Sequence, residues 1–180
     1  MGRRVLIVST SLRGGSNSEL LAKECARGAS DAGHDVEFIS LIGKEIKYCI
    51  GCLACHQDGH CVLSDDVSDI MEKAKEAEVI VFATPIYYYE MCGQMKTLLD
   101  RLNPLYTADY SFRDIYMIAT AAEDHEGTFD KAYNGLQGWV DCFEHATLKG
   151  LVAGGGMVEP KAALDHGAVM TEAYELGREL

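Results

Sequence analysis

The apolar residues of this chain follow two alternating patterns. Short runs of consecutive apolar residues, typical of strands buried on both faces, predict strands over residues 4–9, 35–41, 78–84, 113–121 and 147–153. Between these runs, apolar residues recur at helical spacing and predict helices over residues 18–31, 66–77, 92–102, 129–146 and 161–180. Five strands that alternate with five helices predict an α/β fold, with a parallel sheet covered by helices on both faces.

Three loops of such a sheet are the expected ligand sites. In open parallel sheets, ligands bind beyond the carboxyl ends of the strands, where the strand order switches. We therefore expect a site in the segments that follow Ser9, Thr84 and Thr120. Pro85 is expected to end the third strand.

Composition and charge narrow the possible functions. The 180 residues indicate one domain, over residues 1–180. The net charge of -12 would repel nucleic acid and anionic lipid, and no apolar run approaches the roughly 18 to 20 residues of a membrane span. The apolar run that follows Arg4 is too short for the core of a signal peptide, so we expect no signal peptide. These observations predict a cytoplasmic protein that binds neither nucleic acid nor membrane.

The first loop is rich in small and hydroxyl residues. It reads Ser9-Thr10-Ser11-Leu12-Arg13-Gly14-Gly15-Ser16-Asn17-Ser18 and leads into a helix. The N–H groups at a helix N-terminus receive an anion well, and Arg13 can add a charge-assisted hydrogen bond. The loop is neither a Walker A motif nor G-x-G-x-x-G, and it suits a phosphate monoester better than a pyrophosphate. The alternative is an ordinary helix start with Ser16 as the N-cap.

The second and third loops suit a flat ligand. Pro85-Ile86-Tyr87-Tyr88-Tyr89 follows the third strand, and aromatic side chains there can stack on a ring. Three consecutive tyrosines cannot all face a core. Ala121 and Ala122 follow the fourth strand and leave room for a planar ligand. The alternative is an ordinary strand–helix turn with its tyrosines packed under the sheet.

Four of the seven cysteines lie within thirteen residues. Cys49, Cys52, Cys55 and Cys61 have the spacing C-x2-C-x2-C-x5-C. Such thiols can hold an iron–sulfur cube, can remain metal-free around a redox site, or, together with His56 and His60, can bind zinc. The odd number of cysteines argues against a disulfide framework. The spacing alone leaves these alternatives open.

Together these segments resemble the NAD(P)H-dependent FMN reductases of the flavodoxin-like superfamily. The resemblance rests on residues 9–18, on residues 49–66 and on the run from Thr84-Pro85-Ile86-Tyr87 to Lys96, continued by Asp100-Arg101. It covers nearly the whole chain. It implies a flavodoxin-like, doubly wound five-stranded parallel sheet of order 2-1-3-4-5 that binds FMN.

The resemblance also implies roles for individual residues. The residues that would hold the FMN phosphate are Ser11, Arg13, Ser16, Asn17 and Ser18. Those that would line the flavin ring are Pro85, Ile86, Tyr87 and Tyr88, with Ala121 and Ala122 on its other side. The cysteine spacing is similar to that of the iron–sulfur flavoproteins, a subgroup in which Cys49, Cys52, Cys55 and Cys61 would be the ligands of a [4Fe-4S] cluster.

These observations favour an FMN-dependent oxidoreductase. It would take hydride from NAD(P)H and pass electrons to a flavin, a quinone or an iron-type acceptor, and no catalytic acid or base is expected. One alternative is an iron–sulfur flavoprotein that carries electrons between protein partners. Another is a cofactor-poor scaffold whose tyrosine loops bind a protein. Apolar residues at 88–91 and around Trp139 favour a homodimer or homotetramer.

Overall fold

The core of the protein is a parallel β-sheet. The computed structural model describes residues 2–180. The parallel strands are β1 (Arg4–Ser9), β2 (Asp35–Ser40), β3 (Val79–Tyr87), β5 (Asp114–Thr120) and β6 (Thr147–Gly154). Their order is β2-β1-β3-β5-β6, and a short strand, β4 (Glu90–Met91), pairs antiparallel with β3. Counted without β4, this is the predicted order 2-1-3-4-5, so the flavodoxin-like sheet is confirmed.

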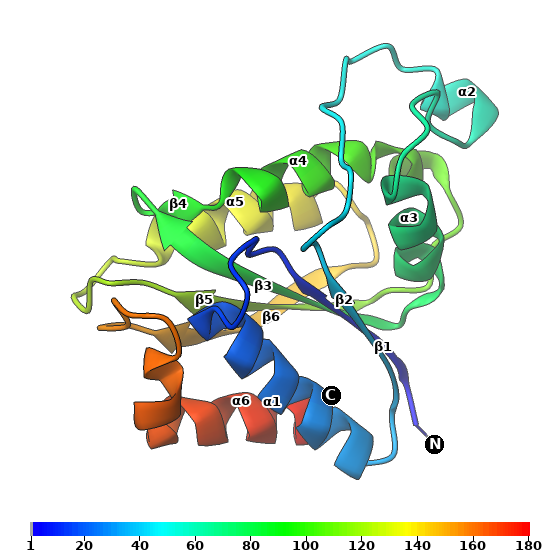
Figure 1. Ribbon diagram of the computed structural model, residues 1–180. Coiled ribbons are helices and arrows are strands. Elements are labelled where there is room, and N and C mark those ends of the chain that lie inside the picture. The colour runs from blue at the N-terminus through cyan, green and yellow to red at the C-terminus, as the bar shows by residue number, and fades with distance from the viewer. Residues whose placement is uncertain (1) are drawn as a thin grey trace.

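Helices cover both faces of the sheet, as Figure 1 shows. One layer holds α1 (Asn17–Asp31) and α6 (Gly167–Glu179). The other holds α3 (Val67–Glu76), α4 (Gly93–Arg101) and α5 (Asp130–Val140). Three short helices, α2 (Cys55–Asp58), η1 (Asn103–Thr107) and η2 (Ala162–Asp165), lie in the connections. No helix within residues 2–180 combines the length and apolar character needed to cross a membrane.

The strands are apolar throughout because each supplies two cores. Val5 and Ile7 of β1 belong to the core beneath α1 and α6, whereas Leu6 and Val8 belong to the core beneath the other layer. This alternation follows from the two-residue repeat of a strand, whose successive side chains point to opposite faces.

Helices α1 and α6 pack with their backbones almost in contact. A Cβ atom built on Gly28 of α1 would lie 2.0 Å from the Tyr174 carbonyl oxygen of α6. A Cβ atom on Gly177 of α6 would lie 2.0 Å from the Cys25 carbonyl oxygen of α1. No side chain fits at either position, so both glycines are required by packing.

The structure departs from the sequence prediction where β3 ends. Pro85 does not end the strand, because β3 continues to Tyr87. The pairing of β1 with β3 stops at Ala83, while Pro85 still pairs with Thr120 of β5. One side of β3 therefore needs no N–H donor at this point, which is where a strand tolerates proline.

Two helices are also shorter than predicted. Helix α5 ends at Val140 instead of residue 146, and the turn that follows packs Phe143 against Trp139. Helix α6 begins at Gly167 instead of residue 161, because Lys161 adopts a left-handed conformation before the separate turn η2.

Met91 and Met95, which are 8% and 0% exposed, belong to the core.

Candidate functional site

The loop between β1 and α1 is the first wall of the candidate site. Ser16 is the N-cap of α1, as the alternative interpretation of this loop expects, and its Oγ accepts a hydrogen bond from the Glu19 N–H. Ser11 Oγ accepts from the Arg13 N–H and so bends the loop, while the Arg13 side chain is exposed. The first N–H groups of a helix have no partner within it. The loop thus offers donors to an anion at the carboxyl edge of the sheet.

Asn17 ties this loop to a distant segment. Its Nδ2 donates to the carbonyl oxygens of Met157 and Glu159, at 3.2 and 2.9 Å. Its Oδ1 accepts from the Ala163 N–H at 3.1 Å. The Asn17 side chain thus holds the connection between β6 and α6, and only its backbone N–H is left for the predicted contact with a phosphate.

Several polar groups of this wall are buried. Ser16, Asn17 and Ser18 are each at most 2% exposed, and the Ser16 and Ser18 hydroxyls lie 3.5 Å apart. Within residues 2–180, Ser9 Oγ at the end of β1 is one of two buried side-chain polar atoms without a hydrogen-bond partner. An acidic group also lies here, since Glu19 accepts from the Gly15 N–H and pairs with Lys23.

The second wall is a strained hairpin. Tyr87 pairs with Glu90, and the turn between them consists of Tyr88 and Tyr89, with φ angles of +53° and +68°. Two consecutive positive φ angles define a turn that normally selects Asn-Gly. The three tyrosines are exposed, Tyr88 by 97%. The prediction that they would not all pack into a core is confirmed.

The third wall is the loop after β5. The Ala121 N–H donates to the Gly154 carbonyl and its carbonyl accepts from Met157, so this backbone is fixed by β6 and its loop. Ala122 is exposed beside it. His125 in the same loop lies against the hairpin, with its Nε2 3.5 Å from the Tyr89 hydroxyl. The two walls predicted to enclose a ring therefore touch at their tips.

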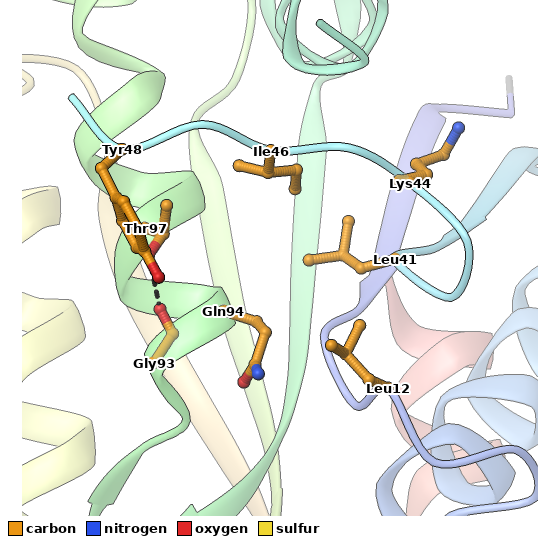
Figure 2. Close-up of a pocket in the computed structure, with 8 residues that line it drawn as sticks. All are labelled: Leu12, Leu41, Lys44, Ile46, Tyr48, Gly93, Gln94 and Thr97. Atoms are coloured by element: carbon orange, nitrogen blue, oxygen red, sulfur yellow. Dashed lines mark hydrogen bonds between the residues drawn. The ribbon is translucent and has the colours of Figure 1, made fainter.

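A cavity of about 320 Å³ opens beside the first wall (Figure 2). A strap between β2 and the cysteines crosses it and contributes Lys44, Ile46 and Tyr48. Leu12 from the β1–α1 loop and Gln94 from the first turn of α4 face it from the other sides. The cavity combines apolar walls with a few polar groups, which is typical of small-molecule sites.

A buried ion pair anchors the cysteine loop to α4. The side chains of Arg101 and Asp65 are 1% and 0% exposed, and Arg101 donates to both oxygens of Asp65 at 2.5 and 3.0 Å. Burial alone would raise the pKa of Asp65. Hydrogen bonds from Arg101 and from the N–H groups of Lys47 and Val67 outweigh burial and hold that pKa below its usual value. Arg101 also donates to the Lys47 and Leu63 carbonyls.

The four clustered cysteines line one small pocket above this ion pair. Cys49, Cys52, Cys55 and Cys61 all face it, as does Arg101, whose Nε is the other buried atom without a hydrogen-bond partner in residues 2–180. Asn103 Nδ2 donates to Cys55 Sγ at 3.1 Å. Four thiols and a cation around one pocket are the residue types that a four-thiolate cluster requires. Their placement does not by itself form a metal site, since no three Cys, His, Asp or Glu side chains in the described part of the chain are close enough to hold a metal ion.

Comparison with known proteins identifies the family. The sequence profile of the NADPH-dependent FMN reductases matches residues 3–132. The chain belongs to this family. Among its relatives, an iron–sulfur flavoprotein of Methanocaldococcus jannaschii is 40% identical over 57% of this chain and 53% of its own. The chain spans about half the length of the curated relatives that it matches first.

Two further matches extend along nearly the whole chain. A Bacillus subtilis protein, named as a candidate NAD(P)H-dependent FMN-containing oxidoreductase, is 26% identical over 97% of both chains. The solved structure of an azoreductase from Bacillus anthracis covers 100% of both chains with a TM-score of 0.74 and 16% identity. The second match supports the flavodoxin-like fold.

The structure also brings in residues that the sequence patterns did not assign. Thr10 and Cys92 are buried at the base of the first two walls, with Thr10 Oγ1 and Cys92 Sγ 3.2 Å apart. The Cys92 N–H donates to Thr84 Oγ1. These contacts join the β1–α1 loop to the hairpin. The available signal in the sequence was a threonine at or next to the end of each of two predicted strands, Thr10 and Thr84. That these strand ends lie side by side depends on the strand order.

Proposed function

We propose that this FMN reductase family member is an FMN-dependent oxidoreductase that is reduced by NAD(P)H. When bound at these walls, FMN would supply the redox chemistry, namely hydride acceptance and electron transfer to an acceptor. The observation that carries the proposal is the wall of buried hydroxyls and helix N–H groups at Ser11 and 16–18, next to two walls suited to a flat ring.

The residues would divide the work between the two ends of FMN. Ser11, Ser16, Ser18 and the exposed Arg13, with the Asn17 N–H, would bind the phosphate. Pro85, Ile86, Tyr87 and Tyr88 would flank one side of the ring, and Ala121 and Ala122 the other. Since the Ala121 N–H already donates to Gly154, Ala122 is the alanine whose backbone is left to approach the ring. No side chain is required as a proton donor.

The phosphate loop is tested by flavin affinity. FMN released by acid should be identified by mass, and FAD in its place would contradict the monoester assignment. Arg13→Ala and Ser16→Ala should each weaken FMN binding roughly 5- to 100-fold, as expected when a hydrogen bond to a charged group is lost. Arg27→Ala is the matched control, because Arg27 pairs with Glu24 and Asp31 at the far end of α1. Unchanged affinity in both loop variants would refute the assignment.

NAD(P)H oxidation separates an enzyme from an electron carrier. Protein loaded with FMN should lose its flavin absorbance when mixed with NADPH or NADH without oxygen. Fast bleaching followed by reoxidation with an added acceptor supports the reductase. No bleaching by either nucleotide, with normal reduction by dithionite, would leave only the carrier.

The cavity in Figure 2 is proposed as the site of a flat acceptor. It adjoins Leu12 of the first wall and the first turn of α4, and Tyr48 and Ile46 offer apolar contact. Gln94→Trp should fill it and raise the KM for a quinone acceptor without changing FMN affinity. Lys96→Trp is the control, because Lys96 lies outside the cavity and pairs with Asp100. Equal KM values in the two variants would exclude this cavity.

A second candidate function is that of an iron–sulfur flavoprotein. The supporting observation is that all four clustered cysteines line one pocket with the cationic Arg101. A [4Fe-4S] cluster held there would relay single electrons. Protein prepared without oxygen should then contain about four irons per chain, and Cys52→Ser should lose them while Cys142→Ser, remote from the pocket, should not. Iron-free anaerobic protein would exclude this candidate.

We also propose a homodimer or homotetramer. Tyr87 and Tyr88 are 55% and 97% exposed beside the candidate flavin site, and a second chain would cover them. Light scattering should give a multiple of the 19.7 kDa chain mass. A monomer at micromolar concentration would contradict this.

A further inference from the structure

Lys161 has a backbone conformation that its residue type disfavours. Its φ angle is +67°, in the left-handed region where a Cβ atom crowds the backbone. It lies between β6 and η2, outside residues 3–132 that define the family match. A non-glycine residue in this region indicates that the surrounding structure holds it there.

The contacts that hold it come from Asn17. Two of the hydrogen bonds of the Asn17 side chain go to Met157 and Glu159, which precede Lys161 in the sequence. The third comes from Ala163, which follows Lys161. The segment that carries Lys161 is therefore fixed against the first turn of α1 from both sides. Lys161 is in this way placed at the phosphate loop, although the two are distant in sequence.

Its side chain extends along that loop. The Cε atom of Lys161 lies 3.5 Å, and its Cγ atom 3.9 Å, from the point that a Cβ atom on Gly15 would occupy. Gly15 also has a positive φ angle, +65°, and leaves this space open. The Lys161 ammonium, one bond beyond Cε, is consequently beside the loop between Arg13 and Ser16.

The local charges leave this ammonium available. Within residues 2–180, neither Lys161 nor Arg13 has a carboxylate within 4.0 Å. The loop carboxylate, Glu19, is paired with Lys23 at 2.9 Å and accepts from the Gly15 N–H. Because Lys23 already serves the Glu19 carboxylate, the charge of a phosphate bound here would be met by Arg13 and, as a second cation, by Lys161.

We propose that Lys161 is a second cationic ligand of the flavin phosphate and makes the protein select FMN over riboflavin. This inference rests on the proposed function. The two cations would bind the same phosphate from the N-terminal and C-terminal parts of the chain. The relevant ligand chemistry is a phosphate monoester on a flavin, because riboflavin has the same ring without the charge.

The test compares FMN with riboflavin. Lys161→Met keeps most of the aliphatic side chain that lies along Gly15 and removes the charge. Its FMN dissociation constant should rise roughly 5- to 30-fold, as for the loss of one charge-assisted contact, while its riboflavin constant should change less than about twofold. Lys149→Met is the control, because Lys149 is on β6 and faces Asp114.

A second variant separates binding from folding. Lys161→Gly tolerates the left-handed conformation, so the urea midpoint of the protein should not fall. Its FMN affinity should nevertheless decrease as in Lys161→Met. If both variants bind FMN as tightly as the wild type, or lose FMN and riboflavin equally, the inference is refuted. If the wild-type protein binds neither flavin, it is the proposed function that fails.

Discussion

The buried pair of Arg101 and Asp65 should be the most sensitive polar contact in the protein. We consider Asp65→Asn, which keeps the size of the side chain and removes its charge. Asp65 accepts hydrogen bonds from Arg101 twice, from the Lys47 N–H at 2.8 Å and from the Val67 N–H at 3.1 Å. An amide in its place turns one acceptor into a donor that faces other donors.

The magnitude follows from the burial of the partner. Arg101 is 1% exposed and cannot regain water when its carboxylate is lost. Leaving such a charge unpaired costs about 3 to 5 kcal/mol. Since domains are typically stable by about 5 to 15 kcal/mol, Asp65→Asn should remove about a fifth or more of the free energy of unfolding. With a urea m-value of about 2 kcal/mol per M, the midpoint should fall by about 2 M.

Urea unfolding followed by far-UV circular dichroism measures this loss. Asp66→Asn is the matched control, because its neighbouring carboxylate is partly exposed and bonds the Glu45 N–H. The control should lose no more than about 1 kcal/mol. A loss in Asp65→Asn no larger than in the control would show that the buried pair contributes little to stability.

The pH dependence provides an independent check. The folded pKa of Asp65 is below its usual value. Its contribution is therefore fully present above the unfolded pKa, about 3.9, and is lost as the pH falls through the lower folded pKa. The stability difference between wild type and Asp65→Asn should be constant from about pH 5 to 8 and should narrow below about pH 4. A difference that grows in acid would contradict this sign.

Three further predictions follow from packing and burial. Gly177→Ala should destabilise the protein by about 3 kcal/mol in urea, because its Cβ would lie 2.0 Å from the Cys25 carbonyl oxygen, and a loss below 1 kcal/mol would show that α1 and α6 can separate. Tyr88→Gly should raise the free energy of unfolding by about 0.5 to 1 kcal/mol by relieving a φ of +53°, whereas a loss would show that the exposed ring makes a stabilising contact. Burial raises the pKa of the Cys25 thiol to about 12, so Cys25 should not react with a thiol reagent at pH 8 until urea is added. Peptide mapping should find the exposed Cys142 labelled at once. Early labelling of Cys25 would mean that the α1–α6 contact opens.

The sheet was predictable because its signals are local and repeated. Each apolar run is long enough for a strand and too short for a helix, and alternation with helical spacing leaves a parallel sheet as the simplest arrangement. The N-cap at Ser16 was equally local. The end of β3 was not, since whether Pro85 can stay in the strand depends on which neighbour has already ended.

The contacts that build the site are long-range, and the sequence pattern does not contain them. Arg101 follows helical spacing like any exposed charge, and its burial depends on Asp65 from another segment. Lys161 and Asn17 are separated by most of the chain. Both positions of this two-residue turn require positive φ angles, which tyrosine disfavours. The residue types at 88 and 89 therefore give no signal of the turn that the structure shows. The roles of the predicted flavin and cysteine residues remain predictions.

The three hydrogen bonds of the Asn17 side chain constrain the order in which parts of the protein can fold. The acceptors and the donor lie 140, 142 and 146 residues further along the chain. During synthesis, the sheet from β1 to β5 can assemble while these residues are still inside the ribosome, but the β1–α1 loop cannot take its final shape. For most of its translation, a nascent chain would therefore have a β1–α1 loop without its contacts to the C-terminal segment. Loading of the proposed FMN would then be a late event that depends on the C-terminal segment, so flavin retention in cells should distinguish finished molecules from interrupted ones.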